Sequence, residues 1–205
     1  MHGAAQTTSL PPRRVRDTGA WWVRMLASIV LMLAGLIAVA PPVMASPEMD
    51  LAAFDITQNE EGVLLSYTVN VDLPRAVEEA LNKSVPLFFV AEAQVFRDRW
   101  YWRDRRVAQA VRVWRIVYQP LTSTYRVNVV GGLSQNYATR AEALAAISRS
   151  VRWKIAEPLQ VEEGSRHYIE FNYRLDTSML PRPMQIGIGG QPEWTMSVER
   201  SQRIN

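Results

Sequence analysis

The chain has 205 residues, with 23 lysines and arginines against 20 aspartates and glutamates, so its formal net charge is +3 and its pI is about 9.4. It contains no cysteine and only two histidines, His2 and His167. These counts exclude a thiol nucleophile, a disulfide framework, a cysteine-based zinc or iron–sulfur site and a metal site built from several histidines. We therefore predict no metal and no cofactor.

The first 45 residues have the composition of an export signal. An uninterrupted apolar run extends from Met25 to Ala40, and Val43-Met44-Ala45 then supplies the small residues that a signal peptidase reads. As a helix the run measures about 24 Å, shorter than the roughly 30 Å of a membrane hydrocarbon core. We expect a signal peptide cleaved after Ala45; the alternative is an uncleaved anchor that holds residues 21–40 in the inner membrane. The basic residues that precede the run are Arg13, Arg14, Arg16 and Arg24.

The excess positive charge of the chain lies entirely in that segment. Residues 1–45 contain four arginines and Asp17, so residues 46–205 keep 19 basic and 19 acidic side chains and carry no net charge. The pI therefore gives no support to a nucleic-acid partner, and we predict none. Because the arginines before the apolar run stay on the cytoplasmic side, we expect residues 46–205 to be exported by the general secretory route and to reside in the periplasm.

Residues 46–205 predict a single β-rich domain. Apolar and polar side chains alternate along most of its segments, and this period of two is typical of strands with one buried face. Short strands without regular intervening helices favour an antiparallel α+β domain, and we predict a two-sheet sandwich with two short helices. The predicted strands are Phe54–Thr57, Gly62–Asp72, Pro86–Phe96, Val107–Tyr118, Tyr125–Val130, His167–Leu175 and Trp194–Val198.

Two segments between these strands predict helices. Pro74–Lys83 has a proline in its first turn and apolar residues at helical spacing. Thr139-Arg140-Ala141-Glu142 is a capping box that opens a helix extending to about Ser150, with Val151 on its apolar face. From Glu199 onward the sequence is polar, and we expect this end of the chain to fray.

Four stretches of the exported part occur in a characteristic combination. They are Ser84–Phe89, Arg99-Trp100-Tyr101-Trp102-Arg103-Asp104, Tyr118–Leu121 with Tyr125–Val127, and Leu175-Asp176 with Leu180–Pro183. Together they resemble a proteobacterial envelope family, domain-of-unknown-function family 4390, over about residues 50–200. The resemblance implies an exported protein that is often encoded near a sensor kinase of the nitrogen-regulation type, and hence an envelope partner such as a sensor histidine kinase. No activity is established for the family, so it implies no catalytic residues.

Charge is distributed unevenly within the exported part. Residues 46–96 carry a net charge of −7, whereas the stretch from Arg97 to Arg126 carries +6. Guanidinium groups bind carboxylates and phosphates in bidentate fashion and stack on aromatic rings, so this stretch is a candidate surface for an anionic partner, glycan or lipid headgroup. The alternative is that the arginines pair with the acidic strands while the tryptophans pack in the core. The candidate binding residues are Arg99, Trp100, Trp102, Arg103, Arg105 and Arg106.

No motif in the sequence indicates a catalytic site. His167 is the only histidine after export, it begins the apolar face of a predicted strand, and no G-x-S-x-G elbow is present. Adjacent glutamates such as Glu60-Glu61 point to different faces of an element, so we assign no catalytic residue. We therefore predict a non-enzymatic interaction or sensing-accessory module of the envelope. Two alternatives stay open: a periplasmic hydrolase of glycan or peptide that uses scattered carboxylates or His167, and an envelope structural factor that binds anionic lipid.

Overall fold

The computed structural model describes residues 49–99, 103–161, 164–188 and 190–204. The chain divides into two compact units, Met1–Met44 and Ala45–Asn205, and every described residue belongs to the second unit. The predicted export segment lies outside the described residues, and so do Trp100 and Trp102. Among the helices of the described part, none is long and apolar enough to cross a membrane.

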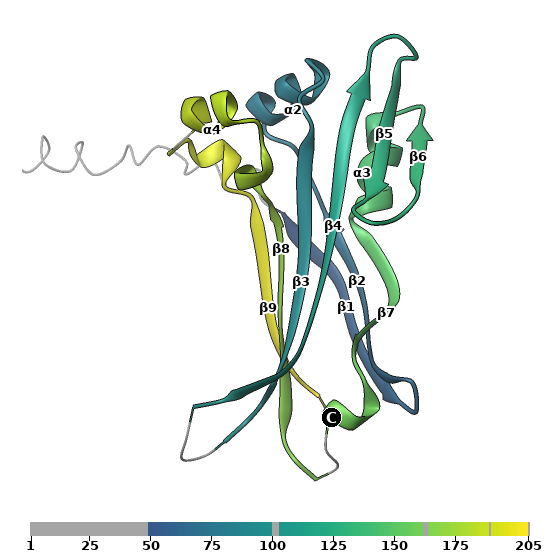
Figure 1. The fold of residues 1–205 in the computed structure, drawn as a ribbon, viewed down its shortest axis with the longest axis vertical. Coiled ribbons are helices and arrows are strands. Elements are labelled where there is room, and N and C mark those ends of the chain that lie inside the picture. Colours follow the sequence, from purple (N-terminus) through teal and green to yellow (C-terminus); the bar gives the residue numbers. More distant parts are fainter. Residues whose placement is uncertain (1–48, 100–102, 162–163, 189, 205) are drawn as a thin grey trace, which may run out of the picture. The chain divides into compact units, whose positions relative to one another are not determined.

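The second unit is built on two antiparallel sheets packed face to face (Figure 1). The small sheet has the strand order β1-β2-β7, and the large sheet has the order β6-β5-β4-β3-β8-β9. This architecture confirms the predicted β-rich α+β sandwich. The strands are β1 Asp50–Asn59, β2 Gly62–Asn70, β3 Leu87–Arg97, β4 Arg105–Gln119, β5 Thr124–Val129, β6 Ser134–Tyr137, β7 Arg149–Ala156, β8 His167–Leu175 and β9 Ser197–Ile204.

Short helices complete the domain. Both predicted helices are confirmed, as α2 (Arg75–Asn82) and α3 (Arg140–Ile147), while α4 (Arg182–Ile188) is a third helix that the sequence analysis did not predict. The capping box of α3 forms as expected: the Glu142 N–H donates to Thr139 Oγ1 at 3.2 Å, and the Thr139 N–H donates to Glu142 Oε2 at 3.3 Å. Three-residue 3-10 helices lie at Pro158–Gln160, Thr177–Met179 and Pro192–Trp194.

The last strand differs from its prediction. Trp194 belongs to a 3-10 helix, and β9 begins only at Ser197 and continues through Ile204. The expected fraying from Glu199 is therefore wrong, because β9 pairs with β8 along an unbroken register from Arg174↔Ser197 to His167↔Ile204. Backbone hydrogen bonds to a buried neighbouring strand order this segment despite its polar side chains.

Strand β7 is not among the predicted strands, because a bulge interrupts the alternation of its apolar and polar residues. Between the pairs Leu65↔Trp153 and Tyr67↔Ser150, Ser66 of β2 faces two residues of β7, and one of them, Arg152, has a φ of 50°. The Arg152 N–H donates to Ser66 Oγ at 3.0 Å. The prediction for Val151 is also wrong. Val151 lies in β7 with 61% of its surface exposed, and not on the apolar face of α3.

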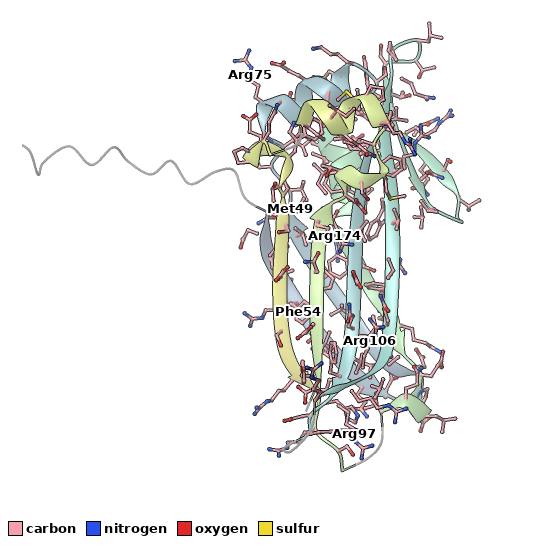
Figure 2. All side chains as sticks on the ribbon, turned by 60° about the vertical axis from the view of Figure 1, so that its left-hand side comes forward. Met49, Phe54, Arg75, Arg97, Arg106 and Arg174 are labelled. Atoms are coloured by element: carbon pink, nitrogen blue, oxygen red, sulfur yellow. The ribbon has the colours of Figure 1, made fainter. Side chains whose placement is uncertain are left out.

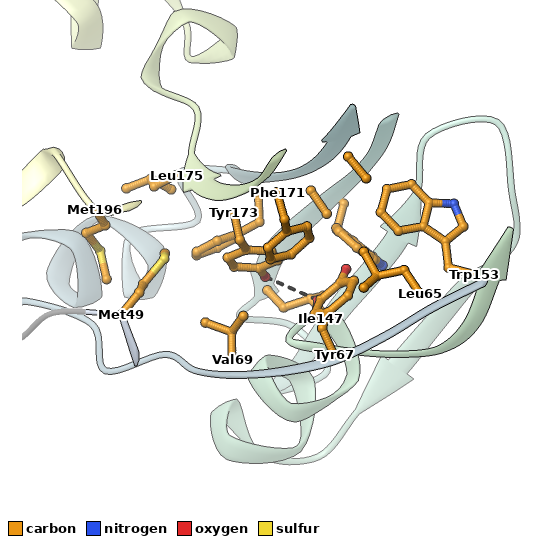
Figure 3. Packing of buried hydrophobic residues seen from close by; sticks show 14 of the residues in the cluster. Met49, Leu65, Tyr67, Val69, Ile147, Trp153, Phe171, Tyr173, Leu175 and Met196 are labelled. Atoms are coloured by element: carbon orange, nitrogen blue, oxygen red, sulfur yellow. Dashed lines mark hydrogen bonds between the residues drawn. The ribbon is translucent and has the colours of Figure 1, made fainter. Parts of the chain in front are cut away.

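The core lies between the two sheets and is rich in aromatic rings (Figure 3). Tyr67 of β2 lies with its ring centroid 4.7 Å from that of Phe171 on β8. The two rings of β8 are accommodated because their cross-strand partners on β3 are small: Ala93 lies opposite Phe171, and Ala91 lies opposite Tyr173. All five side chains are almost fully buried, so large and small residues fill the layer together.

Different elements of the fold lie at the two ends of the sandwich. Met49, where the described chain begins, lies at the end that bears α2 and α4, and Arg97 lies at the opposite end (Figure 2). The β3–β4 connection and the start of β8 belong to the same end as Arg97. This second end contains the segment that the sequence analysis singled out.

Two buried tyrosine hydroxyls differ in their hydrogen bonding. The Tyr173 hydroxyl donates to the Ile147 carbonyl at 3.1 Å, whereas the Tyr67 hydroxyl is buried with no hydrogen-bond partner in the described structure. Burial raises the pKa of both hydroxyls above their usual range, and the Arg112 guanidinium partly offsets the effect at Tyr67. Both groups are therefore neutral.

We predict opposite stability changes for the two tyrosine-to-phenylalanine variants. Tyr67→Phe removes an unpaired buried hydroxyl and should raise the free energy of unfolding by about 1 kcal/mol. Tyr173→Phe removes a hydrogen bond and leaves the Ile147 carbonyl unpaired, so it should lower that free energy by about 1 kcal/mol. Urea unfolding followed by tryptophan fluorescence measures both changes; equal destabilisation by the two variants would contradict the assignment.

Candidate functional site at the arginine-rich end

Seven arginines and only two aspartates of the described chain gather where β3 ends, β4 and β8 begin, and β9 ends. Cross-strand register brings them together: Arg97 lies opposite Arg105, and Tyr168 lies opposite Arg203. Like charges placed directly opposite each other destabilise a sheet, so this end favours anionic contacts. We call it the arginine-rich end, and its arginines are Arg97, Arg99, Arg103, Arg105, Arg106, Arg166 and Arg203.

A β-bulge determines which way one of these arginines points. The register of β3 and β4 shifts between Val95 and Phe96, so Phe96 lies opposite Arg106 and Val107 is the extra residue. Without that insertion Val107 would face Phe96, and Arg106 would lie on the other face of the sheet. The bulge therefore places Arg106 on the outer face of the large sheet.

On that outer face, four side chains from four strands form a continuous row. Register pairs link Arg106 of β4 to Phe96 of β3, Phe96 to Tyr168 of β8, and Tyr168 to Arg203 of β9. The Phe96 and Tyr168 rings stack with centroids 5.3 Å apart and an interplanar angle of 14°. We call these four residues the arginine–aromatic row. A stacked pair with an arginine on each side combines the two side-chain types that most often anchor binding interfaces.

The two aspartates of this end are engaged by the domain itself. Asp104 accepts a hydrogen bond from the Tyr168 hydroxyl at 2.8 Å and another from the Arg99 N–H at 3.1 Å. Asp98 lies 3.9 Å from the Arg166 guanidinium, and its N–H donates to the Arg166 carbonyl at 2.9 Å. These contacts hold the β3–β4 connection against the start of β8. Asp98 and Asp104 thus form their hydrogen bonds and ion pair within the domain.

The predicted binding residues are distributed as follows. Arg103, Arg105 and Arg106 are exposed, and Arg99 is half-buried. Arg106 donates to Gln94 Oε1 at 3.4 Å, whereas Arg103 and Arg105 form no hydrogen bond or ion pair within the described residues. The remaining two candidates, Trp100 and Trp102, lie outside the described part of the chain.

Four glutamates of the acidic first third pair with arginines that lie outside the stretch from Arg97 to Arg126. Glutamates of that region pair with arginines from other segments, namely Glu61 with Arg152, Glu78 with Arg140, Glu79 with Arg75 and Glu92 with Arg174. Three of these four pairs join different elements of the fold, and the exception is the pair Arg75–Glu79 within α2. None of these four glutamates pairs with an arginine of the arginine-rich end, although the β1–β2 turn that contains Glu61 lies at the same end of the sandwich (Figure 1).

Sequence reasoning did not find the residues that β8 and β9 contribute. Phe96, Tyr168 and Arg203 come from strands far apart in the sequence, and the strand order β3-β8-β9 brings them together. The alternation in His167–Leu175 places Tyr168 on the polar face of its strand. The alternation predicts which face of the strand Tyr168 occupies, but it does not predict which strands lie on either side.

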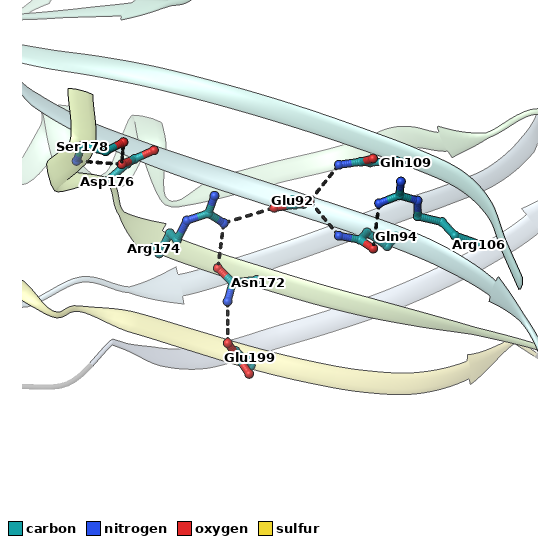
Figure 4. Close-up of polar contacts among 9 residues, drawn as sticks. All are labelled: Glu92, Gln94, Arg106, Gln109, Asn172, Arg174, Asp176, Ser178 and Glu199. Carbon is teal, nitrogen blue, oxygen red and sulfur yellow. Dashed lines mark hydrogen bonds and ion pairs between the residues drawn. The ribbon is translucent and has the colours of Figure 1, made fainter. Parts of the chain in front are cut away.

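A polar network covers the outer face next to the arginine–aromatic row (Figure 4). Glu92, whose side chain is 19% exposed, accepts hydrogen bonds from Gln94 at 2.7 Å, Gln109 at 2.8 Å and Arg174 at 3.2 Å. Asn172 continues the network to the next strand. It accepts from Arg174 at 3.2 Å and donates to Glu199 at 2.6 Å. Its residues border an open hollow of about 500 Å³.

The side chains of this network hydrogen-bond mainly to one another. Both Glu92 carboxylate oxygens accept hydrogen bonds from neighbouring side chains, so the carboxylate is fixed as a hydrogen-bond anchor within the sheet. His167 is buried, and its Nδ1 lies 3.1 Å from the Ser165 carbonyl oxygen. In the described ranges no group of three or more histidine, aspartate or glutamate side chains has the geometry of a metal site.

The fold is a β-sandwich with exposed arginines concentrated in the β3–β4 connection and the first residues of β4. A family model described as Domain of unknown function (DUF4390) matches residues 46–204, which is most of the chain, and the protein therefore belongs to that family. This match confirms the resemblance found in the sequence. Searches of curated proteins and of solved structures gave no significant match.

We predict that Asp104 controls the ionisation of Tyr168. Burial first, and then the hydrogen bond to Asp104 and the negative charge of that carboxylate, raise the pKa of Tyr168 to about 12. Because this pKa is higher than that of an unfolded tyrosine, about 10, the interaction stabilises the folded state below pH 10. The stabilisation is lost as the pH rises toward 12.

The variant Asp104→Asn should therefore lower the pKa of Tyr168 while leaving it above 10, because burial persists. Ultraviolet titration of tyrosinate in the variant and the wild type measures this change. Asp98→Asn is the control and should cause a smaller shift, because Asp98 makes the smallest of the contributions to this pKa. An unchanged titration in Asp104→Asn would refute the contact between Asp104 and Tyr168.

Proposed function

We propose that this protein is a non-enzymatic binding module of the cell envelope, and that its arginine-rich end contacts an acidic surface of another envelope protein. The observation that carries the proposal is a local charge imbalance. Arg103, Arg105 and Arg106 are exposed in the β3–β4 connection and the first residues of β4, while Asp98 and Asp104 beside them are engaged in contacts within the domain.

The geometry of this end favours a partner that bears carboxylates. Arginines bind carboxylates through two parallel hydrogen bonds in a planar fork. The row Arg106–Phe96–Tyr168–Arg203 adds a stacked aromatic pair between two cations. Arginine and aromatic residues dominate the binding energy of protein interfaces. A partner with acidic residues around an apolar or aromatic group would complement the row.

The envelope location is supported by the sequence. The basic, apolar and small-residue pattern of residues 1–45 is that of an export signal, and the family resemblance implies an exported protein encoded near a sensor kinase. An extracytoplasmic domain of a sensor histidine kinase is therefore the partner we propose to test first. Its association would be steered by charge and weakened by salt.

We predict that neutralising the three exposed arginines abolishes capture of the partner without unfolding the domain. The variant is Arg103→Gln with Arg105→Gln and Arg106→Gln, in the full-length protein expressed in its own cells and crosslinked there. Mass spectrometry of the attached proteins should show the main partner reduced by about tenfold or more, since removal of interface charge pairs costs several kcal/mol. Thermal unfolding should change little, because exposed charges contribute about 0–1 kcal/mol each.

The matched control removes the same charge from other surfaces. Arg115, Arg149 and Arg182 are exposed, and their simultaneous replacement by glutamine should leave capture at the wild-type level. Equal loss in the control would mean that net charge, and not the arginine-rich end, is responsible. Wild-type capture by the first variant would refute the proposal. Crosslinking to anionic lipid alone would favour the lipid-binding alternative instead.

A further inference from the structure

Strand β9 is an edge strand whose outer side is open (Figures 1 and 2). The Leu175 N–H donates to the Met196 carbonyl at 3.0 Å, in the same register as all the later β8–β9 pairs. Hydrogen-bonded pairs alternate along an antiparallel ladder, so Val198, Arg200, Gln202 and Ile204 bond to β8. Their neighbours Ser197, Glu199, Ser201 and Arg203 direct their backbone N–H and C=O groups to the open edge, where no hydrogen bond to them occurs within the described residues.

The other sheet edges are blunted. β1 has a register shift between Leu51 and Ala53, and β7 has the bulge at Arg152. β6 has only four residues. Bulges, short strands and charged side chains on an edge are means by which proteins prevent edge-to-edge pairing. β9 has charged side chains at Glu199, Arg200 and Arg203, but it has no bulge and is not short: it has eight residues, and its register with β8 is continuous.

The sequence of β9 is complementary to itself when read in the opposite direction. In antiparallel pairing about Ser201, Glu199 of one copy lies opposite Arg203 of the other, and Val198 lies opposite Ile204. Arg200 meets Gln202, and Ser201 meets Ser201. Opposite charges and apolar pairs placed directly across two strands stabilise their pairing. Because the arrangement has two-fold symmetry, the Ser201 pair lies on the axis and occurs once, and every other pair occurs twice.

From this complementarity we infer that two copies of the protein associate through β9, joining their large sheets into one continuous sheet. Ser201, Glu199 and Arg203 all point their backbone groups outward, so the pairing forms six backbone hydrogen bonds: two between the serines and two for each Glu199–Arg203 pair. Two ion pairs lie on the outer face of the sheet. Two contacts between Val198 and Ile204, which are half-buried in one copy, lie on the inner face.

The neighbouring registers are less favourable. A shift of two residues in one direction places Arg200 opposite Arg200, and like charges in that position are destabilising. A shift of two in the other direction places Arg203 opposite Ser201 and removes both ion pairs. A shift of one residue would bring the backbone groups out of phase. The charge pattern therefore specifies one register, and the two arginine-rich ends then point in opposite directions.

The absence of cysteine from the chain makes this pairing directly testable. In the inferred dimer the two Ser201 Cα atoms are about 5.5 Å apart, which is within the range that a disulfide spans. We expect full-length Ser201→Cys to form a disulfide-linked dimer under mild oxidation. Ser197→Cys is the matched control. It is an exposed serine of the same strand and face, but its two copies would be too far apart to link.

Charge reversal tests the register. Introducing Glu199→Arg into Ser201→Cys places two like-charge pairs across the edge, and the rate of dimer formation should fall by about tenfold or more. Adding Arg203→Glu exchanges the two charges and should restore the rate. Restoration also shows that the single variant had not simply unfolded. Arg203 belongs to both the arginine–aromatic row and the dimer edge, whereas Arg103, Arg105 and Arg106 do not lie on β9. The variants at positions 103, 105 and 106 should therefore dimerise normally, which separates this inference from the proposed function.

Three results would overturn the inference. Ser201→Cys could link no faster than Ser197→Cys, the charge exchange could fail to restore the rate, or Ser201→Cys could link mainly to a different protein. The first result would leave β9 unpaired, and the second would exclude this register. The third would make β9 the docking edge for a strand of another partner.

Discussion

Burial of the apolar face of the three-stranded sheet is the interaction on which the rest of the structure depends. Tyr67 at the centre of that sheet contacts Phe171 and Tyr173 of β8, with ring centroids 4.7 and 6.2 Å away, and Trp153 of β7 at 6.2 Å. The apolar face of a sheet must be buried against another layer, so the three-stranded sheet packs on the second sheet. Ala91 and Ala93 provide the space for the rings on the facing strand.

This packing determines what the outer surfaces can do. With the inner faces of β3, β4 and β8 occupied by the core, their outer faces are left for polar side chains, and the register of the same strands aligns Glu92 with Asn172 and Phe96 with Tyr168. The polar network and the arginine–aromatic row are thus two parts of one surface. They differ in charge balance: Glu92 is compensated by Arg174, whereas Arg103 and Arg105 have no carboxylate partner within the described ranges.

Much of the fold could be predicted because its elements are encoded locally. The alternation of β2 and β8 and the capping box at Thr139 are properties of short stretches, and both form as predicted. β7 could not be predicted in the same way, since the bulge at Arg152 disrupts its period of two. The side chains of β9 are mostly polar, as is common in an edge strand. A polar segment near the end of a chain also suggests fraying, so the sequence alone did not predict the full length of this strand.

The candidate site could be predicted only in part. Consecutive arginines are visible in the sequence, and Arg103, Arg105 and Arg106 are indeed exposed. The contributions of Tyr168 and Arg203, and the engagement of Asp104, depend on which strands lie side by side. The pairing of β3 with β8 joins distant parts of the chain and is not encoded in any single stretch of sequence, so the order β3-β8-β9 had to come from the structure.

The claim that the arginine-rich end is a binding surface is tested most directly by photo-crosslinking in living cells. A photoreactive amino acid at position 105, in the exposed start of β4, should give one dominant adduct with another protein. The same amino acid at the exposed position 182 of α4 should not give that adduct. High salt applied to isolated membranes before irradiation should weaken the adduct, because the contact is electrostatic. No adduct at position 105, or the same adducts from both positions, would contradict the claim.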